Sequence, residues 1–342
     1  MKNSIIIKLN IFFILFIIFI LFISAAATKD TDIFGKVTLV LGDVQIYSLN
    51  DSKPSSLKIN TNILLGDTIE TGKESKAEIV MTDNKTKIII MEKTKVKLSS
   101  LINPDKQKQT IISILFGSIN SIVQKLSGSS TYIIQTPNGS ASVRGTEFIV
   151  SVSDTIDTVV SVTDGEVVYQ KEEEGQYFSI TQNQYCISEI DKSPNISSGE
   201  FENETWLTER NNQFEQNSAA KSDIIAANLF NIVKTIGTLV YAVQDFVNNS
   251  LVFKLLTKRL TPFEIFQFAS QKAGILQRVY EFYFRLNLYD TIVLGFYRFF
   301  DFLSRTNSNF IETRDRCWQS HLNLSNWISK IVELYRIIWL FY

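Results

Sequence analysis

The residue types that usually carry catalysis are scarce in this sequence, which contains one histidine, His321, and two cysteines, Cys186 and Cys317. Nucleophile pairs of the Ser–His–Asp and Cys–His kinds need an imidazole, and structural zinc needs closely placed Cys or His ligands. These counts therefore exclude most imidazole-based catalysis, histidine-rich metal sites and a disulfide-dense scaffold, and they allow one disulfide at most. We expect His321 to lie near the C-terminal end of a helix, where its protonated ring would interact favourably with the helix dipole.

Carboxylates are the other side chains that could do chemistry. Asp154 with Asp157, and the run Glu172–Glu174, have the composition of a glycosidase acid pair or of a calcium site. Acidic residues in loops are usually only solvated, so we expect neither role. The sequence also lacks a GxxxxGK[ST] phosphate loop, a GxGxxG turn, an HExxH helix and a GxSxG elbow. We therefore predict a protein that is not an enzyme and has no catalytic residues, no cofactor, no metal and no small-molecule substrate.

Arg144 stands out because it is the only arginine before Arg210, in a region that otherwise uses lysine. A guanidinium offers five donors in one plane, which lysine cannot replace where several carbonyls or a carboxylate must be bridged. Two roles are open for this side chain. It either fixes a turn to the neighbouring strands, together with Glu147, or it binds a ligand.

Residues 1–27 predict an export signal. Two lysines precede an uninterrupted apolar run over residues 11–23, and small residues follow it. The run is shorter than a membrane span, and an Ala-x-Ala pattern fits cleavage before Thr28. Alternatively, residues 9–27 stay uncut as a signal anchor. The rest of the chain is then exported in both cases, to the periplasm or the cell exterior, and is attached to the inner membrane only if the signal is uncleaved.

Residues 28–194 predict an all-β sandwich or barrel. Short runs that alternate between apolar and polar residues recur there, separated by turn dipeptides. Three hairpins are expected, and the last carries the Asp-Gly pair typical of a type I′ turn. They join 76–81 to 86–91 around Asp83, 131–136 to the next strand through Pro137-Asn138-Gly139, and 160–163 to 166–169 through Asp164-Gly165.

Three phrases in this region carry a family resemblance. LGDTIETG at 65–72, VRGTEF at 143–148 and VSVTDGEV at 160–167 follow one another in an order and spacing similar to those of the FecR domain family. The resemblance implies a periplasmic antiparallel β-sandwich of jelly-roll type. The best-known members relay a signal from an outer-membrane receptor to a cytoplasmic sigma factor, but residues 1–10 are too few for their sigma-binding segment, so we do not expect that role. The resemblance gives a structural or binding role to Gly66, Asp67, Thr71, Gly72, Pro137, Arg144, Gly145, Thr146, Phe148, Asp164 and Gly165.

The composition changes after the β region. Residues 195–221 predict a polar linker with one weak helix, and 222–342 predict a separate all-α domain. No segment there has eighteen apolar residues without a charge, so we expect no transmembrane bundle. The segment 290–305 has an unusually wide apolar arc, which fits either the core of a bundle or a membrane surface or partner groove. The expected helices are 222–247, 262–286, 290–306, 309–321 and 325–340.

These observations lead to two functional hypotheses. The sequence has 34 basic and 35 acidic residues, a net charge of −1, so we expect no nucleic-acid partner. The first hypothesis is an exported, non-enzymatic envelope protein that binds another envelope protein or a polysaccharide, with membrane-surface contact through 222–342. The second is a membrane-anchored signalling protein of FecR type that relays an envelope signal to a membrane partner.

Overall fold

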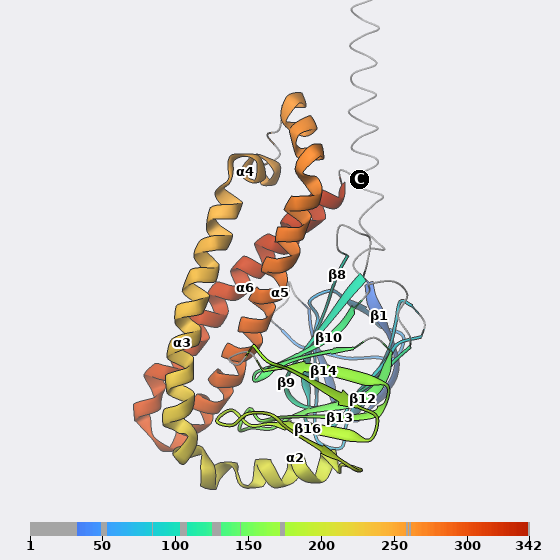
Figure 1. Cartoon of the computed structure of the whole chain (residues 1–342), viewed down its shortest axis with the longest axis vertical. Helices are drawn as coiled ribbons and strands as arrows, with labels where there is room; N and C mark the ends of the chain where they lie inside the picture. Colours follow the sequence, from blue (N-terminus) through green and yellow to red (C-terminus); the bar gives the residue numbers. More distant parts are fainter. Residues whose placement is uncertain are drawn as a thin grey trace, which may run out of the picture.

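The computed structural model describes residues 33–340 except 49–52, 84, 103–107, 125–130, 144, 172–174, 258 and 260. The predicted export signal, Arg144 and Glu172–Glu174 therefore lie outside the described residues. The chain forms a β-sandwich followed by a bundle of long helices (Figure 1). This arrangement confirms the predicted fold class, a mostly antiparallel β-sandwich followed by an α-helical region.

The two layers of the sandwich, sheet A and sheet B, share one strand. In both sheets the described strands pair antiparallel, except that the shared strand β9 runs parallel to β10 in sheet B. Sheet A contains, in spatial order, β4 (Asn62–Leu64), β1 (Ile33–Leu41), β6 (Lys76–Met81), β7 (Lys87–Ile90), the second half of β9 (Lys108–Val123), β12 (Thr146–Val152), β13 (Thr158–Asp164), β16 (Gln184–Ser188) and β17 (Asn195–Ser198). Sheet B contains, also in spatial order, β3 (Ser55–Ser56), β2 (Val44–Tyr47), β5 (Thr68–Thr71), β8 (Lys95–Ile102), the first half of β9, β10 (Thr131–Thr136), β11 (Gly139–Val143), β14 (Glu166–Gln170) and β15 (Tyr177–Thr181).

Strand β9 passes from sheet B to sheet A at Gly117. Its first half pairs with β8 and β10, whereas the residues from Gly117 onward pair with β12 and those from Ile119 onward also with β7. Gly117 has φ +91°, and a Cβ there would lie 2.5 Å from Cα of Thr94. The Thr94 hydroxyl also accepts from the amide of Ser118 at 2.9 Å, which fixes the chain just beyond the bend. Only glycine therefore fits the point at which the two sheets are joined.

The core lies between the sheets and is filled by the inward-facing half of each alternating strand. Tyr132 and Phe148 meet there edge to face, with ring centroids 6.2 Å apart. The hydroxyl of Tyr132 is not orphaned by burial, since it lies 3.0 Å from the Ser121 hydroxyl. The core also includes the fully buried residues Phe34, Ile79, Ile90, Ile114, Val150 and Tyr169.

Two of the three predicted hairpins are confirmed, and the third is wrong. β6 pairs with β7, and β10 pairs with β11 from Thr136 opposite Gly139. The strands on either side of Asp164-Gly165 do not pair with each other, because β13 belongs to sheet A and β14 to sheet B. Gly165 has φ +89°, but Asp164 does not have the positive φ that a type I′ turn also requires. The Asp-Gly pair therefore forms a corner between the sheets.

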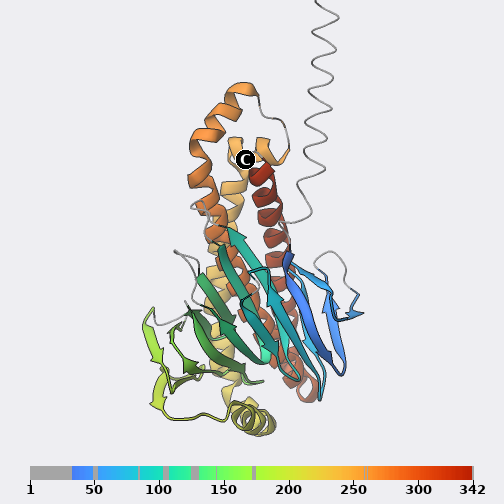
Figure 2. The ribbon, with the colours of Figure 1, turned by 90° about the vertical axis from the view of Figure 1, so that its right-hand side faces the viewer.

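Three long helices, α3, α5 and α6, run side by side in alternating directions (Figures 1 and 2). Helix α5 begins at Pro262, where a helix is predicted, and Thr261 and Glu264 form a capping box at its start. The predicted breaks near 287–289 and 322–324 are wrong, since α5 and α6 continue through them. No Gly or Pro interrupts these positions, and the buried Asn287 amide donates to the Tyr283 carbonyl of its own helix at 2.8 Å. The helices are α2 (Asn203–Asn212), α3 (Phe214–Asn248), α4 (Ser250–Leu256), α5 (Pro262–Thr306), the 3₁₀ turn η1 (Ser308–Phe310) and α6 (Ile311–Leu340).

The region predicted as a linker is largely structured. Residues 195–198 form β17, which pairs with β16, and α3 already begins at Phe214. One stretch of α3, Lys221–Asn248, is long and apolar enough to cross a membrane by length and composition, with a mean hydropathy of 1.5 in its most apolar window. This stretch was not identified from the sequence, because the criterion applied there required eighteen apolar residues without a charge and Lys234 lies within the stretch.

Helix α5 covers the outer face of sheet B, which makes the molecule three-layered at this point (Figure 2). Ile111 of β9 faces away from the sandwich core and packs into the helical core instead. The buried amide of Gln135 on β10 donates to the Phe284 carbonyl at 3.2 Å. In the 290–305 segment, Phe296 and Phe300 are 1% and 0% exposed, so the bundle-core interpretation of its apolar arc is confirmed.

A close contact between α5 and the sandwich depends on Gly295. A Cβ at this position would lie 2.6 Å from Cβ and 2.7 Å from Cγ of Pro137, in the β10–β11 turn. We expect Gly295→Ala to lower the free energy of unfolding by about 1 to 3 kcal/mol, because the added methyl group forces the helix and the turn apart. Gly274→Ala, in the same helix but with no atom within 4 Å of the new Cβ, should raise it by about 0.5 to 1 kcal/mol. Urea unfolding of both variants checks this, and equal effects would contradict it.

Both cysteines are buried free thiols in different cores. Cys186 belongs to the sandwich core and Cys317 to the helical core. Burial raises the pKa of each thiol to about 12, so almost no thiolate is present at neutral pH. We expect a thiol reagent to label neither cysteine in the native protein and both in denaturant, as counted by mass spectrometry. Rapid labelling of either one in the native state would contradict this burial.

Candidate functional site

The signature residues upstream in the chain form turns. Gly66, at φ +90°, donates its amide to the Leu98 carbonyl at 2.7 Å. The buried Asp67 carboxylate accepts from the Leu64 amide at 2.8 Å, and the Gly72 amide donates to the Asp43 carbonyl at 2.8 Å. The Thr71 hydroxyl donates to the Met91 carbonyl at 2.5 Å, which ties β5 to the turn before β8. These contacts fix the turns at the two ends of β5.

The downstream signature residues form the corner between the sheets. A Cβ on Gly165 would lie 2.7 Å from the carbonyl oxygen of Gly145, so the two glycines pack against each other. The Thr146 hydroxyl donates to the Glu166 carbonyl at 2.9 Å, and Phe148 lies in the core. Asp164, the last residue of β13, is exposed beside this corner. Pro137 packs on Gly295. The described signature residues are thus spread over the sandwich and are not gathered into one site.

A groove of about 560 Å³ lies between the outer face of sheet B and helices α5 and α6. We call it the sheet–helix groove. Its volume is within the range of sites that hold small molecules or short polymer segments. Of the signature residues, Gly66 contributes to its wall. The lining residues are Tyr47, Ser48, Gly66, Thr68, Lys95, Lys97, Ser113, Leu115, Phe116, Asp290, Thr291, Leu294, Tyr297, Arg298, Asp301, Trp318, His321 and Ser325.

Strand and helix periodicity bring these side chains together. On β8, Lys95 and Lys97 are two residues apart and therefore face the same side of sheet B. On α5 the lining positions recur at spacings of three and four from Asp290 to Asp301, which places them on one side of the helix. On α6, Trp318, His321 and Ser325 follow the same rule. The groove is thus built from strands β2, β5, β8 and β9 and from helices α5 and α6, and the strands and helices are far apart in the sequence.

A charge cluster around the buried Asp290 forms part of the wall of the sheet–helix groove. Oδ1 of Asp290 lies 2.6 Å from Nδ1 of His321, and its Oδ2 lies 3.5 Å from Nζ of Lys97. The Asp290 side chain is only 3% exposed. Burial alone would raise the pKa of this carboxyl, but the charge of Lys97 and the hydrogen bond from His321 outweigh it, and the pKa lies below its usual range. The cluster therefore ties sheet B, α5 and α6 together.

Arg298 forms a second charged contact in the groove. Its guanidinium lies over the Phe116 ring, 3.4 Å from the centroid, and Nη2 is 2.6 Å from Oδ1 of Asp154. Burial lowers the pKa of this guanidinium, and the carboxylate of Asp154 opposes that effect. The planar cation is thus held between an aromatic face and an acid, a geometry that lysine would not reproduce.

Aromatic rings make up much of the remaining wall. Tyr297 and Trp318 are 5.1 Å apart between centroids, and Trp318 is 5.0 Å from the His321 ring. Trp318 is 40% exposed, so part of its indole face is open to solvent. Across the groove, Nζ of Lys95 lies 4.6 Å from the centroid of Tyr47. Burial and the neighbouring Glu70 raise the pKa of Tyr47, which keeps its hydroxyl a hydrogen-bond donor.

The acids of the groove are not arranged as a catalytic pair. Asp290 and Asp301 are eleven residues apart on one helix, a rise of about 16 Å, which exceeds the separation that glycoside hydrolysis uses. Asp157 is fully buried and bridged by Lys221 at 3.2 Å and Arg210 at 3.6 Å, so it stabilises the loop after β12. Among the described residues, no group of three or more His, Cys, Asp or Glu side chains could hold a metal ion.

The prediction for His321 was wrong. This residue was expected near a helix C-terminus, but α6 runs from Ile311 to Leu340 and His321 lies in its interior, paired with Asp290. Asp290, Lys97 and Trp318 were not identified as site residues either. No sequence motif marks these three residues, because they lie in three separate segments of the chain. They form a cluster only when the helices pack on sheet B.

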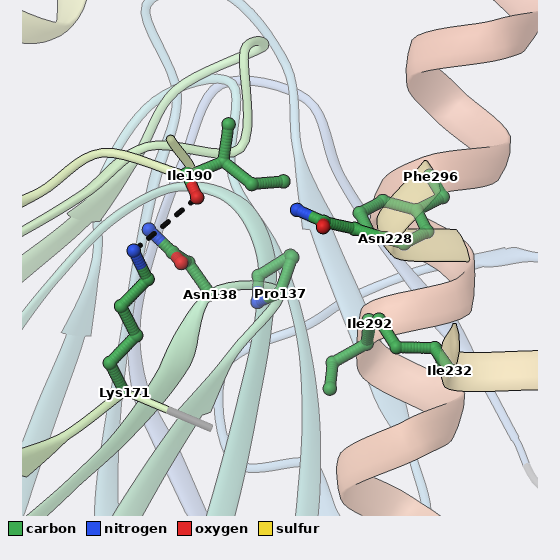
Figure 3. Close-up of a pocket in the computed structure, with 8 residues that line it drawn as sticks. All are labelled: Pro137, Asn138, Lys171, Ile190, Asn228, Ile232, Ile292 and Phe296. Carbon is green, nitrogen blue, oxygen red and sulfur yellow. Dashed lines mark hydrogen bonds between the residues drawn. The ribbon is translucent and has the colours of Figure 1, made fainter. Parts of the chain in front are cut away.

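A second, smaller cavity lies beside the Gly295–Pro137 contact (Figure 3). Its volume of about 40 Å³ has room for little more than a water molecule. The ammonium group of Lys171 points toward it and donates to the carbonyls of Glu189, Ile190 and Lys192 at 3.0, 3.3 and 2.6 Å. These bonds use its three hydrogens, so we interpret this cavity as part of the packing.

Comparisons with known proteins find one family model and several solved structures that match part of this chain. The family model described as FecR protein matches residues 67–168. Two crystal structures of a "putative anti-sigma factor" from Parabacteroides distasonis ATCC 8503, at 2.50 and 1.65 Å resolution, are 16% and 17% identical over 39% and 41% of this chain, with TM-scores of 0.34 and 0.35. The matches span 60% and 64% of those chains. A "Cell surface anchoring domain" is 26% identical over 19% of this chain and 84% of its own, with a TM-score of 0.18. No curated protein matches the chain.

Proposed function

Because residues 67–168 form a FecR domain, we propose that this chain is an exported, non-enzymatic binding protein of the bacterial envelope. Its ligand, a polysaccharide or another envelope protein, occupies the sheet–helix groove. FecR proteins are envelope-associated and generally non-enzymatic. The groove is the observation that carries the proposal, since it is the place where sheet B and the helices together form a concave, mixed surface.

The lining of the groove supports a ligand with both apolar faces and hydroxyl groups. Trp318, Tyr297 and Tyr47 offer flat apolar surfaces, while Lys95 and Arg298 hold hydrogen-bond donors in fixed positions. Few precisely placed polar groups within an aromatic wall are typical of binding sites that select by orientation. A polysaccharide segment, with pyranose faces and hydroxyls, satisfies both kinds of surface, and so does a peptide rich in aromatic and acidic residues.

Trp318 provides the test of this proposal. We expect Trp318→Ala to weaken binding to isolated cell-envelope polysaccharide, or to the partner protein, by at least about tenfold, which corresponds to about 1.4 kcal/mol. The matched control is Tyr177→Ala on β15, an aromatic residue that is 67% exposed and outside the groove. In intact cells, a photo-reactive residue at position 318 should cross-link to the ligand on illumination, and one at position 177 should not. Unchanged binding by Trp318→Ala, with unchanged thermal unfolding, would refute the groove as the site.

The anchored signalling protein is the second candidate, since the apolar segment 9–27 could remain uncut. The two candidates differ in the N-terminus of the protein in the cell. Mature protein that begins at Thr28 supports the exported form. Protein that retains residues 1–27 and stays in the inner membrane fraction supports the anchored form.

A further inference from the structure

One end of the helical bundle projects away from the sandwich (Figures 1 and 2). Large apolar side chains at this end are exposed to solvent. We call residues 249–278, which contain α4 and the first part of α5, the bundle tip. Within it Phe263 is 75% exposed, Phe253 48% and Ile265 42%. Scattered exposed apolar residues are normal, but three within 253–265 at one projecting end form a cluster.

The exposure of the bundle tip does not come from loose packing of its helices. On the inner side of α4, Leu251, Val252 and Leu255 are 7%, 3% and 1% exposed. Phe268, one turn and a half after Phe263, is buried at 2%. The tip therefore has a filled core, and the exposed side chains belong to its outer surface.

The bundle tip is also strongly basic. The chain as a whole has a net charge of −1, whereas residues 249–278 contain five basic residues and one acidic residue, a net charge of +4. Glu264 pairs with Lys254, so the acidic residue neutralises one of the five. The basic residues are Lys254, Lys258, Arg259, Lys272 and Arg278.

We propose that the bundle tip docks on an anionic lipid surface. Phenylalanine side chains gain free energy at the boundary between headgroups and acyl chains, while lysine and arginine are attracted to anionic phosphates. A second copy of this chain is an unfavourable partner for the bundle tip, because two tips of charge +4 would repel each other. This inference does not depend on the proposed function. The groove begins at Asp290, about 18 Å further along α5 than Arg278, so docking leaves it free.

The test needs a local probe, because the apolar N-terminal segment of the full chain could bind lipid by itself. Thr257→Cys places one reactive thiol in the tip, since both native cysteines are buried. Thr238→Cys on α3 is the matched control site. Both threonines are exposed, and each hydroxyl donates to the carbonyl four residues earlier, at 2.9 Å for Thr257 and 3.3 Å for Thr238. Each variant carries an environment-sensitive dye and is mixed with vesicles of phosphatidylcholine with or without phosphatidylglycerol.

We expect the dye at 257 to brighten about two- to threefold and shift to the blue with the anionic vesicles, and to respond less as salt rises. The dye at 238 should not change. Phe263→Ser should abolish the response at 257, and Phe230→Ser, at a residue 72% exposed in the middle of α3, should not. Equal dye responses at 257 and 238, or no response at 257, would overturn the proposal. In a further control without vesicles, unlabelled protein is added to the protein labelled at 257. A dye response there would overturn the proposal in favour of self-association.

Discussion

Gly117→Ala is expected to lower the free energy of unfolding by about 3 to 5 kcal/mol, or to prevent folding. Two costs add at this position. A non-glycine residue at φ +91° is strained by about 1 kcal/mol, and the new methyl group would lie 2.5 Å from Cα of Thr94 and 2.6 Å from the Lys93 carbonyl oxygen. Both contacts are with backbone, so no rotamer change can relieve them. Urea unfolding followed by circular dichroism measures the loss.

Gly175→Ala separates the two costs. Gly175 also has a positive φ, +59°, but no atom lies within 4 Å of a Cβ built there. This control should therefore show only the backbone strain, about 1 kcal/mol. If both variants lost the same stability, the steric requirement at the bend of β9 would be disproved.

Asp290→Asn is expected to destabilise the protein by about 3 kcal/mol at neutral pH. The substitution leaves Lys97 partly buried without its counter-charge and removes the carboxylate that pairs with His321, and removing one member of a buried pair is costly. Asp301→Asn is the control on the same helix. Asp301 is 30% exposed and pairs with Arg305 at 2.8 Å, so its loss should cost less than about 1 kcal/mol.

The effect of Asp290 should depend on pH in one direction. The pKa of this carboxyl is lower in the folded protein than its usual value, so its ionised form stabilises the fold above the unfolded pKa of about 4. That stabilisation is lost as the pH falls through the folded pKa. The difference between Asp290→Asn and the parent should thus be full at pH 7 and shrink progressively below about pH 4. A difference that stays constant down to pH 3 would show that Asp290 acts through packing alone.

The features that could be predicted from the sequence are those set by short stretches of chain. The β6–β7 hairpin and the Thr261–Glu264 capping box depend on residues within a few positions of one another. The Asp164-Gly165 corner shows the limit of such rules. Local preferences favour a reversal there, but they do not decide whether the next strand returns to the same sheet or crosses to the other. That choice depends on β11 and β16, which pair with β14 and β13.

The sheet–helix groove could not be predicted for the same reason. Lys97 and Asp290 are 193 positions apart in the sequence. Neither residue type nor periodicity indicates that β8 and α5 meet. The wide apolar arc of 290–305 favoured a bundle core but also fitted a membrane surface or a partner groove. The structure shows that two residues of its polar stripe, Asp290 and Arg298, contact sheet B at Lys97 and Phe116. The FecR signature predicted the sandwich. Most of its described residues lie in turns and at the corner between the sheets, so they did not indicate the position of the groove.

The covering of sheet B by α5 has a consequence for synthesis of the chain. The last strand ends at Ser198, but Gly295, which seats α5 on Pro137, is made about 100 residues later, some 5 to 20 seconds at ordinary elongation rates. During that interval Ile111, Ile133 and Gln135, which end up nearly or fully buried, face water on the outside of a finished sandwich. The nascent protein thus passes through a stage in which an apolar sheet face can contact other chains. Whether it aggregates at this stage depends on how quickly the C-terminal helices are synthesised and pack on sheet B.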